Sequence, residues 1–156
     1  MAAEDNKYLV FNLGKEIYGI PILKITTIER KMDITHIPKT PSYVKGIANL
    51  RGKIIPVMDL KQKFGLGVTE TTERTCVIVV DIRTDSGSQT NGLVVDNVSE
   101  VLDMEEDGYI EPVPKYGDTQ IDQEFMSGIG KIGDRVIIFL DIEKILVKSE
   151  SQAGAK

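Results

Sequence analysis

Few side chains in this sequence could do chemistry by themselves. The 156 residues include one histidine and one cysteine. His36, in the segment Thr35-His-Ile-Pro38, lacks the further ligands or partners that a metal site or a catalytic triad needs. Cys76 opens an apolar run, where a single thiol behaves as a small hydrophobic side chain. We therefore interpret His36 as a loop residue and Cys76 as a core residue, and we predict no metal site.

Asp59 and Asp141 could be read as a pair of carboxylates for acid–base catalysis. Each follows an apolar run and precedes a short helical pattern, over 60–64 and 142–146. At that position a side-chain oxygen accepts hydrogen bonds from the free backbone N–H groups of the helix start. The sequence therefore predicts two helix caps, no catalytic residue and no enzymatic activity.

The glycines of residues 128–133 satisfy the pattern G-x-G-x-x-G, which is typical of dinucleotide-binding loops. Such a loop must open a helix whose N-terminus faces the pyrophosphate. Here a β-rich run follows the glycines instead. We interpret them as turn residues and predict no cofactor.

Composition excludes further classes of protein. The formal net charge of −5 argues against general nucleic-acid binding, which draws affinity from Lys and Arg. No apolar stretch approaches the roughly 20 residues of a membrane span, and the polar first six residues lack a signal core. We expect a cytoplasmic protein that binds no nucleic acid and does not insert into the membrane.

Short runs rich in Ile and Val, bounded by Gly, Asn and Asp, predict β-strands. Polar residues 83–91 predict a hairpin connection, the threonine-rich segment 67–74 a linker, and residues 149–156 a flexible tail. The predicted strands include 8–11, 53–58, 76–80, 92–95 and 136–140.

An internal repeat is the most informative feature of the sequence. Residues 46–60 match residues 128–142 at a constant spacing of 82 positions (128 − 46), with Gly46 opposite Gly128 and Asp59 opposite Asp141. Each copy has the pattern of two strands, a turn and a short helix. We therefore expect two related structural units.

A fainter match lies upstream in each unit. Residues 19–22 resemble residues 92–95 at a spacing of 73 positions (92 − 19), with Ile25 and Ile28 opposite Val98 and Val101. Two units of several short strands suggest paired small barrels, because closing a sheet buries one face and removes exposed edges. We expect one domain with a first half at 7–66 and a second at 75–148, which could exchange segments.

Two features of the first half could serve a partner. Ile22, Ile25 and Ile28 recur with helical spacing, which predicts either a core face or a groove for a partner helix. Arg51 stands where the second copy of the repeat has Gly133, so the scaffold does not require Arg there. A guanidinium on a tight turn could bind a partner's carboxylate bidentately.

Ordered motifs run along residues 7–148: Phe11-Asn-Leu-Gly14, Tyr18-Gly-Ile20, Ile22-Leu-Lys24, Val44-Lys-Gly-Ile-Ala-Asn-Leu-Arg-Gly52, Ile55-Pro-Val-Met-Asp-Leu60, Gly92-Leu-Val-Val-Asp96 and Asp141-Ile-Glu-Lys-Ile145. Together they resemble the CheW family of chemotaxis coupling proteins, most specifically over 46–60. The resemblance implies a mainly β fold of two packed five-stranded SH3-like barrels with short helices. It also implies a scaffold that joins the cytoplasmic tips of methyl-accepting receptors to the regulatory domain of the histidine kinase CheA, in arrays beneath the inner membrane.

The resemblance also implies roles for individual residues. Arg51 matches the family's receptor-associated arginine, and Asn49 lies beside it on the same turn. Gly46 matches a glycine linked to kinase coupling. Ile25 and Ile28 fall on the expected receptor groove, with Val98 and Val101 as second-half candidates. This sequence departs from the pattern at residue 27, where some members carry Glu and this chain has Thr27, with Glu29 two places on.

Two other interpretations remain open at this point. One is an adaptor similar to CheV, or a detached regulatory domain of the kinase. The other is a small enzyme that uses His36 or the glycines of 128–133. Loss of turnover in His36→Ala would support the enzyme.

Overall fold

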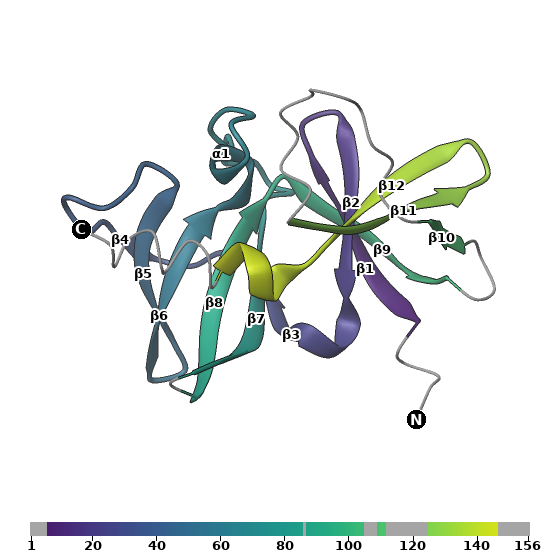
Figure 1. The fold of residues 1–156 in the computed structure, drawn as a ribbon. Coiled ribbons are helices and arrows are strands. Elements are labelled where there is room, and N and C mark those ends of the chain that lie inside the picture. Colours follow the sequence, from purple (N-terminus) through teal and green to yellow (C-terminus); the bar gives the residue numbers. More distant parts are fainter. Residues whose placement is uncertain (1–5, 86, 105–108, 112–124, 147–156) are drawn as a thin grey trace, which may run out of the picture.

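The chain folds into two packed, six-stranded β-sheets with short helices at their margins (Figure 1). The computed structural model describes residues 6–85, 87–104, 109–111 and 125–146. Sheet I has the order β10-β11-β12-β2-β1-β9 and sheet II the order β3-β7-β8-β6-β5-β4.

The strands of sheet I are β1 (Lys7–Leu13), β2 (Glu16–Pro21), β9 (Asn97–Asp103), β10 (Tyr109–Glu111), β11 (Met126–Ile132) and β12 (Arg135–Leu140). Those of sheet II are β3 (Ile25–Glu29), β4 (Ile34–Thr35), β5 (Val44–Leu50), β6 (Lys53–Asp59), β7 (Cys76–Thr84) and β8 (Gly87–Val95). The helical pieces are η2 (Ile22–Lys24), α1 (Leu60–Lys63) and residues 142–146.

Each sheet contains strands from both halves of the sequence. The hairpin β1–β2 lies in sheet I beside β9 and β12, whereas β3 to β6 cross into sheet II beside the hairpin β7–β8 (Figure 1). The sheets therefore do not follow the halves 7–66 and 75–148, because η2 and the residue between β8 and β9 carry the chain from one sheet to the other. The proposed tail at 149–156 lies outside the described residues.

The internal repeat governs the topology. In sheet II, β6 runs parallel to β8 with Val57 opposite Gly92, and in sheet I, β12 runs parallel to β2 with Phe139 opposite Gly19. These pairs are related by the same spacings of 82 and 73 residues that the sequence shows. A β-carbon on Gly19 would lie 2.8 Å from a Phe139 ring carbon, so glycine permits this close approach. The predicted mainly β pseudo-repeat is confirmed, with six strands in each described sheet.

Among the described residues, three cores stabilise this arrangement. One apolar cluster lies between the sheets, and two smaller clusters lie inside the curl of sheet II and of sheet I. Strand β7 contributes to two of them, since Ile78 and Val80 face the other sheet while Val77 and Val79 face the interior of sheet II. Burial on both faces explains why this strand is a continuous apolar run rather than an alternating one.

Sheet II curls far enough to bring its edges together. Its two edge strands, β3 and β4, are joined only by residues 30–33, which span at most about 17 Å. The side chains of Arg51, on the β5–β6 turn, and Glu29, on β3, meet near this seam. The hairpin tip and the edge strand therefore form one surface.

An ion pair holds each crossover between the sheets. The Lys24 ammonium in η2 lies 2.7 Å from the Glu143 carboxylate, and the Lys61 ammonium on α1 lies 3.5 Å from that of Asp96. Asp96 also accepts a hydrogen bond of 2.7 Å from the backbone N–H of Gly14. The two crossovers are thus fixed in equivalent places. In the first, the crossover supplies the lysine and the helical segment the glutamate, whereas in the second the crossover supplies the aspartate and the helix the lysine.

Two local predictions need correction. The helical interpretation of Ile22, Ile25 and Ile28 is wrong, because only residues 22–24 form a 3-10 turn and β3 begins at Ile25. The connection predicted at 83–91 is shorter than its polar sequence indicates. Strands β7 and β8 continue to Thr84 and from Gly87, since polar cross-strand pairs also satisfy an exposed strand end.

Candidate partner-binding site

Strand β3 presents Ile25 and Ile28 on one face despite their spacing of three residues. Ile25 pairs with Val80 and Ile28 with Ile78, and the register shifts between them. Cross-strand neighbours share a face, so a bulge at Thr26 turns both isoleucines toward sheet I. The spacing that resembled a helix is therefore the signature of a bulged strand.

Strand β9 repeats this geometry in sheet I. Val98 pairs with Phe11 and Val101 with Leu9, again across a register shift, here with Ser99 as the extra residue. Phe11 and Leu9 belong to the core between the sheets, so both valines face that side. The two strands thus present equivalent pairs of apolar side chains.

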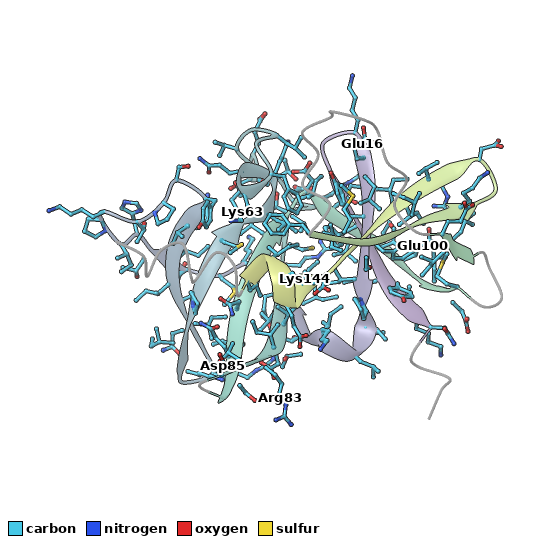
Figure 2. The ribbon with its side chains drawn as sticks, viewed as in Figure 1. Glu16, Lys63, Arg83, Asp85, Glu100 and Lys144 are labelled. Carbon is cyan, nitrogen blue, oxygen red and sulfur yellow. The ribbon has the colours of Figure 1, made fainter. Side chains whose placement is uncertain are left out.

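The four apolar candidates divide into anchors and exposed residues. Ile25 and Val98 pack against the same inter-sheet core. Figure 2 shows the side chains that fill the junction between the two sheets. Ile28 and Val101 remain 40% and 48% exposed. The exposed pair is available to a partner, whereas the anchors fix the strands that carry it.

Arg51 adopts a backbone conformation that is unfavourable for its residue type. Its φ is 51° and that of Gly52 is 90°, the pattern of a type I′ turn. The matching residue in the other copy of the repeat is Gly133, with φ of 59°. The fold thus places Arg where its own repeat uses glycine, at a cost of about 1–2 kcal/mol for the side chain. Backbone conformations of this kind cluster at binding and active sites.

Asn49 stabilises the turn that carries Arg51. Its side-chain oxygen accepts a hydrogen bond of 2.8 Å from the backbone N–H of Gly52. The repeat has Lys131 at the matching position. Asn49 therefore supports the backbone conformation of Arg51, and it lies on the same turn as Arg51, as expected from the sequence.

Two residues left outside the predicted site lie within it. The Arg51 guanidinium is 3.6 Å from the Glu29 carboxylate, and the Thr27 hydroxyl donates a hydrogen bond of 3.1 Å to the same carboxylate oxygen. Had 25–29 been read as a strand, its two-residue period would have placed Thr27 and Glu29 on one face.

Gly46 lies apart from Arg51 and has no side chain to offer. It is buried, with φ of 144°, and a β-carbon there would overlap the carbonyl oxygen of Thr35 in β4. A β-carbon on its counterpart Gly128 would lie 2.9 Å from the Glu111 carbonyl oxygen of β10. Five residues of strand, roughly 16 Å, separate Gly46 from Arg51.

The residues that invited a catalytic interpretation have structural roles. The fully buried Asp59 carboxylate caps α1 and also accepts hydrogen bonds of 2.8 and 2.7 Å from the backbone and hydroxyl of Thr69. Asp141 accepts one of 3.1 Å from the Lys144 N–H, so both predicted caps are confirmed. Gly133 lies in the β11–β12 turn, with no helix opening there.

Two further side chains have shifted pKa values with plain structural causes. A hydrogen bond from Lys24 holds the pKa of Glu143 below its usual value, and burial raises the pKa of Tyr18. Within the described ranges, His, Cys, Asp and Glu form no group of three that could hold a metal. In the same residues no helix is long and apolar enough to cross a membrane.

The fold defines a protein of two β-modules that exchange strands. A family model described as "CheW-like domain" matches residues 7–150. The chain is 40% identical to the chemotaxis protein CheW of Klebsiella aerogenes, over 92% of this chain and 83% of that protein. For the CheW protein of Helicobacter pylori the identity is 36%, over 93% and 86%.

A solved structure agrees with these sequences. The crystal structure of scaffolding protein TtCheW from Thermoanaerobacter tengcongensis has a TM-score of 0.76 and 42% identity, covering 88% of this chain and 89% of that one. The chain belongs to the CheW family of chemotaxis scaffold proteins.

Proposed function

We propose that this protein is a non-enzymatic adaptor that couples methyl-accepting chemotaxis receptors to the histidine kinase CheA. It acts in the cytoplasm, at receptor arrays, and needs no cofactor. Its partners are the cytoplasmic tip of the receptor and the regulatory domain of the kinase. Receptor conformation changes kinase activity because the adaptor binds the receptor's states with different affinities.

The observation that carries this proposal is the strained backbone of Arg51. A guanidinium is kept on a left-handed turn residue where the repeat has glycine, and its side chain is 73% exposed. Arg binds carboxylates in a planar, bidentate geometry that Lys cannot reproduce. Arg51 therefore fixes the receptor helix in register through a carboxylate, and Asn49 acts through the turn.

The apolar residues supply the rest of the receptor contact. Ile28 and Val101 are exposed on the strands that Ile25 and Val98 anchor in the core between the sheets. An amphipathic helix that lays its apolar face across both strands would bury these side chains. Such an interface has moderate strength, which suits a contact that must respond to signals.

Gly46 acts on the kinase contact through shape. Because a β-carbon there would displace Thr35, the glycine allows β4 to pack closely on β5. The kinase then binds the exposed residues of this edge, Thr35 and His36. Along β5, about five residues, roughly 16 Å, separate Gly46 from Arg51 of the proposed receptor contact.

Calorimetric titration tests both contacts, with CheA regulatory domain in one series and a recombinant receptor tip in the other. We expect one-to-one binding of each by the wild type. Arg51→Glu should lose the receptor and keep the kinase and the fold. Lys131→Glu, an exposed cation in the equivalent hairpin of sheet I, serves as the matched control and should bind both. Full receptor binding by Arg51→Glu would contradict the role of Arg51.

A further inference from the structure

Four aromatic rings form a continuous row through the junction between the two sheets. Phe11 stacks on Tyr18 with ring centroids 6.0 Å apart, and Tyr18 stacks on Phe64 at 5.9 Å. Phe64 contacts Phe125 at 6.2 Å. Aromatic pairs attract each other at these separations. Because Phe11 and Tyr18 lie in sheet I, and Phe64 ends the helix that follows β6 of sheet II, the row connects the two sheets.

One end of the row lies beneath the proposed receptor contact. On β9, Val98 lies directly opposite Phe11 of β1, next to the bulge at Ser99. The Ser99 hydroxyl donates a hydrogen bond of 3.2 Å to the Val10 carbonyl, which attaches the bulge to β1. Phe11 is fully buried, and a ring in a close-packed core cannot move without moving its neighbours. A helix that presses on β9 at Val101 would therefore displace Phe11.

The other end of the row is attached to the start of β5. The Lys63 ammonium of α1, labelled in Figure 2, lies over the Tyr43 ring at 4.4 Å from its centroid, within the range of a cation–π contact. The backbone N–H of Asp59, the cap of α1, donates a hydrogen bond of 2.7 Å to the Tyr43 carbonyl. Strand β5 begins at the next residue and carries Gly46, which lies against β4. A displacement of α1 would therefore reach the edge proposed for the kinase.

The internal repeat shows that the scaffold does not require this row. Three of the four rings correspond to side chains without a ring in the other copy: Val80 for Phe11, Asn91 for Tyr18 and Leu146 for Phe64. The last two have the spacings of the repeat, 73 (91 − 18) and 82 (146 − 64), and Val80 pairs with Asn91 as Phe11 pairs with Tyr18. Only Phe125 has an aromatic counterpart, Tyr43. The row is therefore a feature of one half of the molecule, as Arg51 is.

We propose that the aromatic row couples receptor binding at β9 to kinase binding at the β4 edge. Two sites are coupled when both favour particular arrangements of one packed element, and here that element is the row together with α1. This inference rests on the proposed function and adds the route by which one partner changes the affinity for the other.

The coupling is measured as the ratio of two dissociation constants for the CheA regulatory domain, one without and one with a saturating recombinant receptor tip. We expect the two constants of the wild type to differ by about fivefold or more. Phe64→Leu and Tyr18→Leu each interrupt the row and should bring the ratio close to one. Each partner alone should still bind these variants at nearly the wild-type affinity, because neither residue lies in a proposed contact.

Two variants serve as controls. Tyr18→Phe keeps the ring and removes only the hydroxyl, so the ratio should stay at the wild-type value. Tyr8→Leu removes a ring outside the row, since Tyr8 packs edge-on against Phe139 within sheet I at 4.6 Å. This variant should also keep the wild-type ratio, and circular dichroism establishes that every variant is folded.

A wild-type ratio of one would overturn this inference and leave both partner contacts standing. So would a ratio that Phe64→Leu and Tyr18→Leu leave unchanged, or one that Tyr8→Leu lowers equally, since any loss of packing would then have the same effect. If the wild type failed to bind one of the two partners, the proposed function itself would fall, and this inference would fall with it.

Discussion

Replacing Arg51 by glycine should remove partner binding without weakening the fold. At φ of 51° a β-carbon costs about 1–2 kcal/mol, and glycine avoids that cost. Glycine also makes the unfolded chain more flexible, which lowers the free energy of unfolding by about 0.4–1 kcal/mol. The lost contact with Glu29, at 3.6 Å and largely exposed, contributes at most a few tenths of a kcal/mol.

Arg51→Ala separates the backbone from the guanidinium. Alanine loses the charge as glycine does, but it keeps the β-carbon and therefore the strain. The free energy of unfolding of Arg51→Gly should exceed that of Arg51→Ala by about 0.5–1 kcal/mol. The free energies of unfolding of the wild type and of Arg51→Ala should differ by less than this amount.

Urea unfolding followed by circular dichroism measures these differences. The m-value, which is the slope of the free energy of unfolding against urea concentration, should be the same for all three proteins. Both variants should lose the receptor tip in calorimetry. If Arg51→Gly were no more stable than Arg51→Ala, the backbone at residue 51 would not be strained in solution. The main reason for assigning a function to Arg51 would then be gone.

Two further predictions concern other parts of the fold. Gly46→Ala should lower the free energy of unfolding by about 2–4 kcal/mol, because its β-carbon would meet the Thr35 carbonyl at a strained φ. The affinity of this variant for the kinase should fall, while its affinity for the receptor should persist. Full kinase binding by Gly46→Ala in calorimetry would contradict the role of β4. Glu143→Gln should cost no more than about 1 kcal/mol at pH 7, since the pair with Lys24 is partly exposed. Because the pKa of Glu143 is lowered in the folded protein, its contribution is present above the unfolded-state pKa and is lost as pH falls through the folded value. Urea titrations of the two proteins should therefore converge as pH falls through the lowered pKa of Glu143 in the folded protein, and a constant difference at all pH values would refute this assignment.

Most of the fold could be predicted because the sequence repeats itself. The match of residues 46–60 with 128–142 identifies a strand pair, a turn and a capped helix in each unit, and the structure has all of them. The exchange of strands between sheets could not be predicted in detail. It depends on which distant strands pair, and η2 is only three residues long.

The site was predicted in part. Arg51 stood out because its counterpart is Gly133, a contrast that the repeat itself provides. Glu29 was named in the sequence analysis but left outside the predicted site, because this chain departs from the family pattern at residue 27. On a helix Glu29 would not share a face with Thr27, whereas on the bulged strand β3 the two side chains meet.

Reconstitution of receptor-controlled kinase activity tests the adaptor function most directly. Receptor, CheA and this protein are combined, and ATP turnover by the kinase is measured with and without the receptor's ligand. We expect ligand control of the kinase only when the wild-type protein is present, and its loss with Arg51→Glu. Ligand control that is the same without the protein, or unchanged with Arg51→Glu, would contradict this account.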